Sequence, residues 1–310
     1  MDLPIAIFRA LADPTRLRIF ALLRCMELSV GELAQILVQS QPRISRHIKI
    51  LADASLIERR KEGAWVFLGL GDERLARPLL VALDEWAALE DAEAWMKADK
   101  ARLSAVVADR ARAAEAYFNA NAGMWDELRT LYVADADIEA AITELLAKEA
   151  LGRVVDLGTG TGRMLEVLGA RAESVVGIDR SPEMLRFARA KLASSRVKLY
   201  QGDICALDMP DASAETALLH QVLHYLPQPE TALREAARLL VDGGRLLVVD
   251  FAPHEHEELR TRHAHARLGF SDEQMQAWLM ATGLKMETAR TLAGRELTVK
   301  LWLGRKPRAA

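Results

Sequence analysis

Residues 154–163 read VVDLGTGTGR, in which a short, mostly apolar run leads into three glycines that alternate with threonines. The apolar run predicts a buried strand, and the glycines predict a turn where the backbone approaches a bound molecule closely. The next residues, MLEVLGARA, continue as a helix whose first N–H groups would face the same molecule. The stretch therefore predicts one strand–turn–helix unit of an open α/β sheet.

The residues after this unit repeat the alternation of strand and helix. Strands are expected at SVVGID, which ends in Asp179, at VKLYQGD, which ends in Asp203, at ETALLHQVLHYL and at GGRLLVVDF. Helices are expected between them, and the tail adds a helix that Ser271 caps and Gly283 ends, followed by two strands. The pattern predicts a doubly wound parallel sheet of the α/β class, with ligands beyond the C-terminal strand ends.

Length and composition describe an ordinary globular protein of two domains. The chain has 310 residues, of which 51% are hydrophobic and 27% charged, and a domain takes about 150 residues. No apolar run approaches the ~20 residues that span a bilayer, and the N-terminus has an acid where a secretory leader has a cation. The two cysteines form no disulfide framework. We therefore expect a cytoplasmic protein that does not enter a membrane.

The charge is unevenly distributed along the chain. Residues 1–70 hold ten Lys and Arg against seven Asp and Glu, or 10 − 7 = +3, whereas the whole chain carries −3. Six of these cations form two clusters, at 43–49 and 59–61. Clustered cations on an acidic chain suggest a polyanion partner, although solvated surface charge explains the same composition.

Local patterns in the first 70 residues predict a helix-turn-helix. Asp13 and Pro14 start one helix, and Ser29 with Glu32 form the capping box of a second. A third helix, SQPRISRHIKILAD, starts at Ser40 and turns its apolar residues Ile44, Ile48 and Leu51 inward. Its outward positions are Gln41, Arg43, Ser45, Arg46, His47 and Lys49. The following LIERRKEGAWVFLGL predicts two strands that bend at residues 62–63, a β-wing.

The stretches ALADPTRLRIFALL, SQPRISRHIKILADASLI and RRKEGAWVFLGL resemble winged-helix repressors of the ArsR/SmtB family over roughly residues 5–70. The resemblance implies a homodimer that places one recognition helix per subunit in the major groove of a palindromic operator. It also implies DNA contacts from Ser40, Gln41, Arg43, Ser45, Arg46, His47 and Lys49 on the helix and from Arg59, Arg60 and Lys61 on the wing.

The cysteine pair with which many of these repressors sense metals is missing. Residues 29–31 read Ser-Val-Gly where a Cys-Val-Cys triplet is usual, and Cys25 is the one nearby thiol. A soft metal needs three or four ligands. We therefore predict no metal site and expect sensing elsewhere in the chain.

Residues 72–148 are predicted to be helical. An apolar stripe starts near Pro78, which is expected in a first helical turn. The stripe comprises Leu75, Leu79, Leu83, Trp86, Leu89 and Met96. It suits either a dimerisation helix or an ordinary core helix. The later stretch AYFNANAGMWDELRTLYV resembles the N-terminal cap that small-molecule methyltransferases fold over their cofactor. We expect a DNA-binding and dimerisation domain at 1–98, a helical linker and cofactor cap at 99–148 and a ligand-binding domain at 149–310.

The glycine turn differs from a dinucleotide motif, because its third glycine comes one residue early and Arg163 stands where that motif has glycine. Asp-Leu-Gly-Thr-Gly-Thr-Gly, followed by Gly-Ile-Asp and Gly-Asp-Ile, resembles class I S-adenosylmethionine-dependent methyltransferases of the ubiquinone/menaquinone-biosynthesis-like group. The resemblance implies that the domain binds S-adenosylmethionine or S-adenosylhomocysteine.

The resemblance also implies roles for individual residues. Asp156 would balance the cofactor ammonium, and Asp179 would accept both ribose hydroxyls. Asp203 would accept the adenine amine, with Ile204 and Arg180 beside the ring. Further contacts are expected from Tyr117, Gly158, Thr159, Gly160, Gly162, Met184 and His220, and His220 is also the candidate catalytic residue.

For five other histidines the alternatives are a structural role or, for the four at residues 254–265, a place in the lining of a substrate pocket. His224 is expected to be structural. The pairs His254 and His256, and His263 and His265, are spaced two residues apart, which on a helix places them on different faces and disfavours a shared metal.

Two functions fit the sequence. In one, the chain is a transcriptional regulator whose methyltransferase-like domain binds the cofactor as a small-molecule effector. In the alternative, it is an active small-molecule methyltransferase with an autoregulatory DNA-binding domain.

Overall fold

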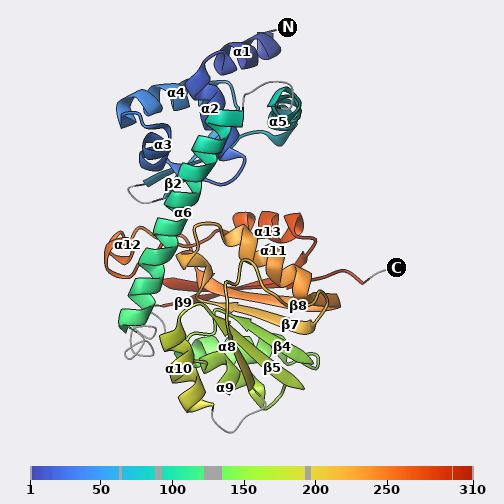
Figure 1. Cartoon of the computed structure of the whole chain (residues 1–310). Helices are drawn as coiled ribbons and strands as arrows, with labels where there is room; N and C mark the ends of the chain where they lie inside the picture. The colour runs from blue at the N-terminus through green and yellow to red at the C-terminus, as the bar shows by residue number, and fades with distance from the viewer. Residues whose placement is uncertain are drawn as a thin grey trace. The chain divides into compact units, whose positions relative to one another are not determined.

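The computed structural model describes residues 2–62, 65–87, 93–121, 135–192, 197–294 and 296–308 (Figure 1). The chain forms two compact units, unit 1 from Met1 to Arg110 and unit 2 from Ala111 to Ala310. The boundary between them falls inside helix α6 (Glu93–Asn121). The division at residues 98 and 148 remains a prediction. Within the described ranges, no helix is both long enough and apolar enough to cross a membrane.

Unit 1 has the predicted winged-helix fold. Its helices before α6 are α1 (Asp2–Leu11), α2 (Pro14–Leu23), α3 (Val30–Leu37), α4 (Gln41–Asp53) and α5 (Glu73–Ala87). The wing strands β2 (Ile57–Glu62) and β3 (Trp65–Leu70) pair antiparallel, and the short β1 (Leu28–Ser29) adds to β3, giving the order β1-β3-β2. The predicted bend at residues 62–63 lies partly outside the described residues. Helix α1 and strand β1 were not predicted from the sequence.

The helix starts of unit 1 follow their capping residues. The Asp13 carboxylate accepts the N–H groups of Thr15 and Arg16 at 2.9 and 3.1 Å, and Ser29 with Glu32 forms the predicted capping box. Ser40 is the N-cap of α4, but its side chain makes no cap hydrogen bond. The inner face of α4 is fully buried in the unit 1 core through Ile44, Ile48 and Leu51.

The prediction for Pro78 was wrong, because this proline lies inside α5 and not in its first turn. The helix begins five residues earlier, where the side chain of Asp72 accepts the N–H of Arg74 at 2.9 Å and acts as a cap. Leu75, Leu79 and Leu83 pack on the core. Trp86 remains 59% exposed.

Unit 2 is built on the predicted doubly wound sheet, with seven strands in the order β6-β5-β4-β7-β8-β10-β9. The strands are β4 (Arg153–Leu157), β5 (Ser174–Asp179), β6 (Val197–Gln201), β7 (Ala214–His220), β8 (Leu240–Phe251), β9 (Lys285–Ala293) and β10 (Thr298–Arg305). The first five run parallel, and β10 is antiparallel to both β8 and β9, as predicted for the tail. Strands β5 and β6 lie on one side of β4, and β7 and β8 lie on its other side. The strand order therefore reverses at β4.

Helices cover both faces of this sheet (Figure 1). On one face α8 (Asp135–Leu146) and α9 (Arg163–Gly169) enclose one core, and on the other α11 (Pro229–Leu239) and α13 (Asp272–Ala281) enclose a second. Helix α10 (Pro182–Lys191) follows β5, and the short η2 (Leu223–Tyr225) follows β7. Ser271 caps α13 by accepting the N–H of Gln274 at 3.2 Å, and Gly283 ends the helix at a φ of +79°.

The four histidines near α12 (Glu258–Arg262) do not share a helix. Two precede α12 and two follow it, so the helical spacing argument does not apply to them. Within the part of the chain that the structure describes, no group of three or more His, Cys, Asp or Glu side chains is placed to hold a metal ion.

Candidate cofactor pocket and DNA-binding face

The glycine turn after β4 packs tightly against the neighbouring strand. The N–H groups of Gly158 and Thr159 donate to the carbonyl of Ile178 at 2.8 and 2.9 Å. Gly158 has a φ of +80°, and a Cβ there would lie 2.5 Å from a methyl group of Val222. A side chain at this position is therefore excluded by both conformation and space.

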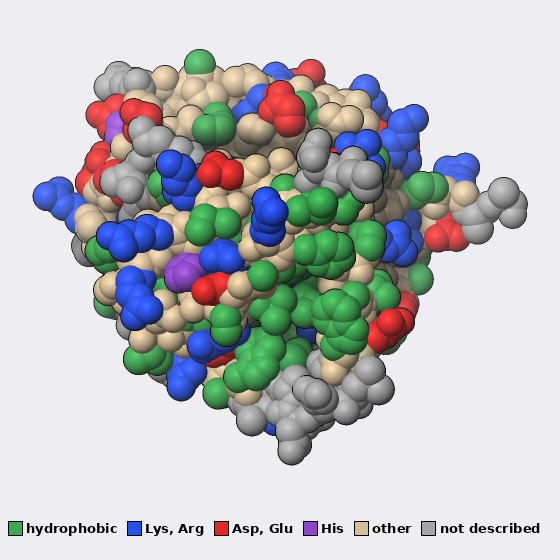
Figure 2. Space-filling model, turned by 90° about the horizontal axis from the view of Figure 1, so that it is seen from above, with side chains coloured by type: hydrophobic (Ala, Val, Ile, Leu, Met, Phe, Trp, Pro, Cys, Tyr) green, Lys and Arg blue, Asp and Glu red, His purple; other side chains and the backbone are tan. Residues whose placement is uncertain are grey.

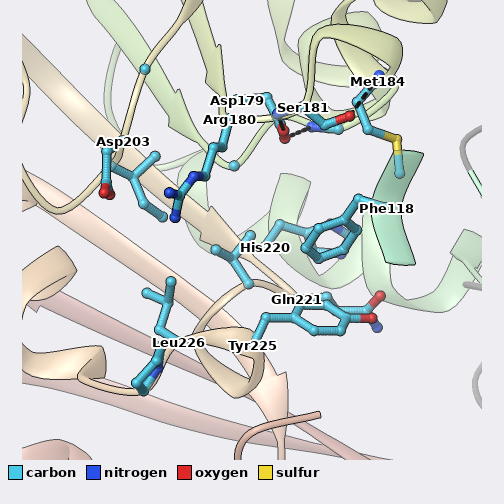
Figure 3. Close-up of a pocket in the computed structure, with 16 residues that line it drawn as sticks. Phe118, Asp179, Arg180, Ser181, Met184, Asp203, His220, Gln221, Tyr225 and Leu226 are labelled. Atoms are coloured by element: carbon cyan, nitrogen blue, oxygen red, sulfur yellow. Dashed lines mark hydrogen bonds between the residues drawn. The ribbon is translucent and has the colours of Figure 1, made fainter. Parts of the chain in front are cut away.

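Asp179, at the end of β5, holds the glycine turn in place by hydrogen bonds. Its Oδ2 accepts the N–H of Gly160 and its Oδ1 accepts the N–H of Ser181, both at 2.8 Å (Figure 3). Burial raises the pKa of this carboxyl above its ordinary value, and the backbone hydrogen bonds oppose that shift. Each carboxylate oxygen keeps a lone pair for a further donor, since a carboxylate has about four acceptor sites.

A cavity of about 930 Å³, including its open mouth, lies beyond the ends of β4, β5 and β7 (Figure 3). This is the place that the reversal of strand order at β4 predicts for a ligand. Eight of the predicted cofactor residues line it: Gly158, Gly160, Asp179, Arg180, Met184, Asp203, Ile204 and His220. The structure thus brings together residues that are up to 62 positions apart in sequence.

Three predicted residues do not line the cavity. Asp156, Thr159 and Gly162 are not among the lining residues. Asp156 is buried and its Oδ2 accepts the hydroxyl of Thr159 at 2.6 Å, so both stabilise the turn from behind. Gly162 is the N-cap of α9, with a φ of +83°. The side chain of Tyr117 lies outside the described residues.

One end of the cavity is aromatic. Phe118 from α6 and Tyr225 from η2 meet edge to face, with ring centroids 4.6 Å apart, and His220 lies beside them (Figure 3). Next to it Gln221 has a φ of +53°, which is uncommon for a residue with a side chain. The opposite end holds Asp179, Arg180 and Asp203. The cavity therefore offers polar groups at one end and apolar rings at the other.

Sequence reasoning did not assign several lining residues to the pocket, namely Phe118, Ser181, Gly202, Gln221, Val222, Leu226 and Pro227. Most of them directly follow a strand that already carried a predicted site residue. Their place after the ends of β5, β6 and β7 was the signal available in the sequence. Phe118 comes from α6, and its sequence carries no comparable signal.

A buried polar cluster lies behind Tyr225. His224 is 1% exposed, and its Nδ1 donates to Oδ1 of the fully buried Asp250 at 2.7 Å. The ring of His265 lies 4.2 Å from that of His224, and burial lowers the pKa of His265 well below its ordinary value. The carbonyl of His224 also accepts the N–H groups of Ala266 and Arg267. This cluster ties η2 to the loop after α12, which agrees with the structural role predicted for His224.

The outer face of α4 is polar and largely exposed. Ser40, Gln41, Arg43, Arg46 and Lys49 are exposed, as is Arg59 on the wing. Ser45 is half-buried, and the side chains of Arg60 and Lys61 lie outside the described residues. His47 does not face freely outward as predicted, because its Nδ1 lies 3.5 Å from the carboxylate of Asp13 at the start of α2.

Two family models match the chain, one in each unit. A model described as a helix-turn-helix domain matches residues 11–60, and one described as a methyltransferase domain matches residues 155–248. The two matches cover the recognition helix and the glycine turn with strands β5 to β7.

Individual relatives are likewise either repressors or methyltransferases. The arsenical resistance operon repressor of Escherichia coli is 40% identical over 111 residues, 36% of this chain and 86% of the repressor. The trans-aconitate 2-methyltransferase of Methylobacterium nodulans is 34% identical over 188 residues, 54% of this chain and 71% of that enzyme. The demethylmenaquinone methyltransferase of Thermus thermophilus is 34% identical over 142 residues, 44% of this chain, and the match spans 64% of that enzyme's length.

Among solved structures, a Haloferax volcanii methyltransferase in complex with the Trm112 activator matches 62% of this chain and 98% of its own, with a TM-score of 0.53 and 22% identity. This likeness supports the fold of unit 2.

The fold and these similarities define a repressor-like winged-helix domain joined to a class I methyltransferase domain. The chain belongs to the ArsR-type winged-helix repressors through its N-terminal part and to the S-adenosylmethionine-dependent methyltransferases through its C-terminal part. The cofactor of unit 2 is S-adenosylmethionine or S-adenosylhomocysteine, and the residues present fit it. Asp179 has acceptor sites for ribose hydroxyls, and the turn at Gly158 leaves space that a side chain would fill.

Proposed function

We propose that this protein is a one-component transcriptional regulator that binds operator DNA through unit 1 and takes S-adenosylmethionine or S-adenosylhomocysteine in unit 2 as its effector. One observation carries the proposal: a single helix, α6, supplies a side chain to each unit. Asp99 of α6 pairs with Arg18 of α2 in unit 1, and Phe118 of α6 lines the cofactor cavity in unit 2. A change at the cavity therefore acts on a helix that is also part of the DNA-binding unit.

The DNA-binding role is supported by the exposed face of α4. Arg43 and Arg46 are exposed one turn apart, as are Gln41 and Lys49 at the two ends of the helix face. Arginine can bind guanine with two hydrogen bonds in the major groove, whereas wing cations such as Arg59 suit the phosphate backbone. The recognition helix would therefore give sequence preference and the wing general affinity.

A homodimer is supported by apolar side chains that unit 1 leaves exposed. On α1 these are Leu3, Ile5 and Phe8, and on α5 they are Val81 and Trp86. Figure 2 shows a face where hydrophobic side chains gather beside Lys and Arg side chains. Exposed apolar patches on a folded protein mark interaction surfaces. We propose that α1 and α5 form the dimer interface, and Phe8→Ser with Trp86→Ser should give monomers in sedimentation velocity.

The test of the sensor role is operator binding measured by fluorescence anisotropy. The DNA is a duplex that the full-length protein has selected from random sequences, and each cofactor form is added separately at saturation. At least one form should change the operator dissociation constant by about 5-fold to 150-fold, the range of an ordinary allosteric coupling. Equal operator affinity with and without both forms would refute the sensor role.

A second function has its own support, namely methyl transfer to a small molecule. His220 and Gln221 provide polar groups at the aromatic end of the cavity, where the methyl group of the cofactor would lie. Relatives named as methyltransferases are 34% identical to this chain over 142 and 188 residues. Formation of S-adenosylhomocysteine from S-adenosylmethionine in the presence of a cell metabolite fraction, lost in His220→Ala, would favour this function. In that case operator binding would remain, and the DNA-binding unit would act as an autoregulatory domain.

A further inference from the structure

Unit 1 contains a cavity of its own, lined by α2, the residues that end it and the N-terminal half of α6. Its volume is about 400 Å³. All its lining residues belong to unit 1, so it shares none with the cofactor pocket of unit 2. We call it the α2–α6 groove. Its size matches that of pockets which hold small organic molecules.

The base of the α2–α6 groove is apolar. Leu22 and Leu103 are buried and face the groove from the two helices. Trp95 and Met96, both half-buried, complete the apolar lining from the start of α6. An indole ring in such a wall offers a flat surface on which a planar ring can stack.

The rim of the groove is cationic. Four cations, Arg18, Arg24, Lys97 and Lys100, and one acid, Asp99, are among its lining residues. The acid is only 3% exposed, and both of its oxygens accept hydrogen bonds from Arg18 at 2.6 Å. Its charge is thereby neutralised inside the protein, and the exposed charges that remain are positive.

The cations retain hydrogen-bond donors for a ligand. Arg18 binds Asp99 through Nε and Nη2, which leaves the N–H groups of Nη1. Arg24 binds the carboxylate of Asp84 through Nη1 alone, at 2.5 Å. Lys100 is exposed and has no carboxylate partner among the residues that the structure describes. A cleft with one sign of charge over an apolar base concentrates ions of the opposite sign.

We propose that the α2–α6 groove is a binding site for a planar organic anion, with its ring against Trp95 and its carboxylate or sulfonate at Lys100 and Arg24. A free inorganic anion would leave the apolar base without a contact, and a neutral ring would leave the charge of Lys100 without a counter-ion. Because the ligand needs both parts, the groove selects amphipathic aromatic anions. This site lies outside the proposed cofactor function and does not depend on it.

The test uses anilinonaphthalenesulfonate, an aromatic anion that fluoresces in apolar surroundings, with the full-length protein. S-adenosylhomocysteine is present at saturation, so that the cofactor pocket is filled. We expect saturable binding of the probe at one site per chain. Phenylnaphthylamine, which has the same rings without the sulfonate, should bind at least about tenfold more weakly.

Two substitutions and one matched control locate the site. Lys100→Glu should weaken binding of the anionic probe by about tenfold or more and leave the neutral probe unchanged. Trp95→Ala should weaken both probes. Lys198→Glu makes the same charge change on exposed strand β6 of unit 2 and should leave both probes unchanged. Circular dichroism melting checks that each variant folds. Parent-like binding of the anionic probe by Lys100→Glu, or equal binding of the two probes by the parent, would overturn the proposal.

Discussion

Replacing Asp179 by alanine should weaken cofactor binding strongly. In the structure its two oxygens accept the N–H groups of Gly160 and Ser181 at 2.8 Å, and about two acceptor sites remain for the two ribose hydroxyls. A hydrogen bond to a charged group contributes about 1.5–3 kcal/mol. Because water replaces part of what is lost, we expect a net loss of about 2–4 kcal/mol, or roughly 30-fold to 1,000-fold in affinity.

The assay is isothermal titration of S-adenosylhomocysteine into the parent and three variants. Asp179→Asn keeps the volume of the side chain but turns an amide N–H₂ toward one of the two backbone N–H donors, so it should also bind weakly. Asp208→Asn removes an exposed acid from the same unit and should bind like the parent. Binding by Asp179→Ala within threefold of the parent would refute the assignment of this carboxylate to the ribose.

The same carboxyl predicts how affinity depends on pH. Burial raises the pKa of Asp179 above the ordinary 3.8, so the group takes up a proton at a higher pH than a free carboxyl does. Ribose hydroxyls need the ionised form as acceptor, and protonation therefore competes with the cofactor. Affinity should fall as the pH is lowered, beginning above the range where ordinary carboxyls titrate. Asp179→Asn should lack this dependence.

Three further predictions concern other parts of the chain. Arg43→Ala combined with Arg46→Ala should abolish specific operator binding in an anisotropy titration while thermal unfolding stays unchanged. Of the two thiols, Cys25 is exposed, whereas burial and then Asp203 raise the pKa of Cys205 to about 12, so a disulfide reagent at pH 8 should label one thiol per folded chain. Asp250→Ala leaves the buried His224 without its carboxylate and should reduce the free energy of unfolding of unit 2 by about 3–5 kcal/mol, measured by urea denaturation.

The fold was predictable because both units have strong local signals. In unit 2, short apolar strands alternate with capped helices, and each predicted strand has an observed counterpart from β4 to β10. In unit 1, the caps at Asp13 and Ser29 fixed where α2 and α3 begin. Helix α1 and strand β1 were not predicted. Helix α1 is a short segment with an apolar N-terminal half, and β1 has only two residues.

The cofactor pocket was predictable where motif residues follow strand ends, as with Asp179 and Asp203. The aromatic end of the pocket was less predictable. Phe118 reaches the cavity through the packing of α6, and packing leaves no local pattern in the sequence. His47 shows the same limit on the DNA-binding face. Helical periodicity placed it outward, but the tertiary approach of Asp13 gives it a carboxylate 3.5 Å away.

Any sensing of the cofactor ratio must depend on the aromatic end of the pocket. S-adenosylmethionine and S-adenosylhomocysteine share the groups that Asp179 and Asp203 bind, and they differ by one methyl group and one positive charge at sulfur. A ring face beside that charge favours the charged form by about 0.5–2 kcal/mol. Phe118 and Tyr225 form an edge-to-face pair there, so one of the two can present its face to the sulfonium. Since Phe118 belongs to α6, which also carries Asp99 of the DNA-binding unit, the residue suited to distinguish the two forms lies on a helix that the DNA-binding unit shares.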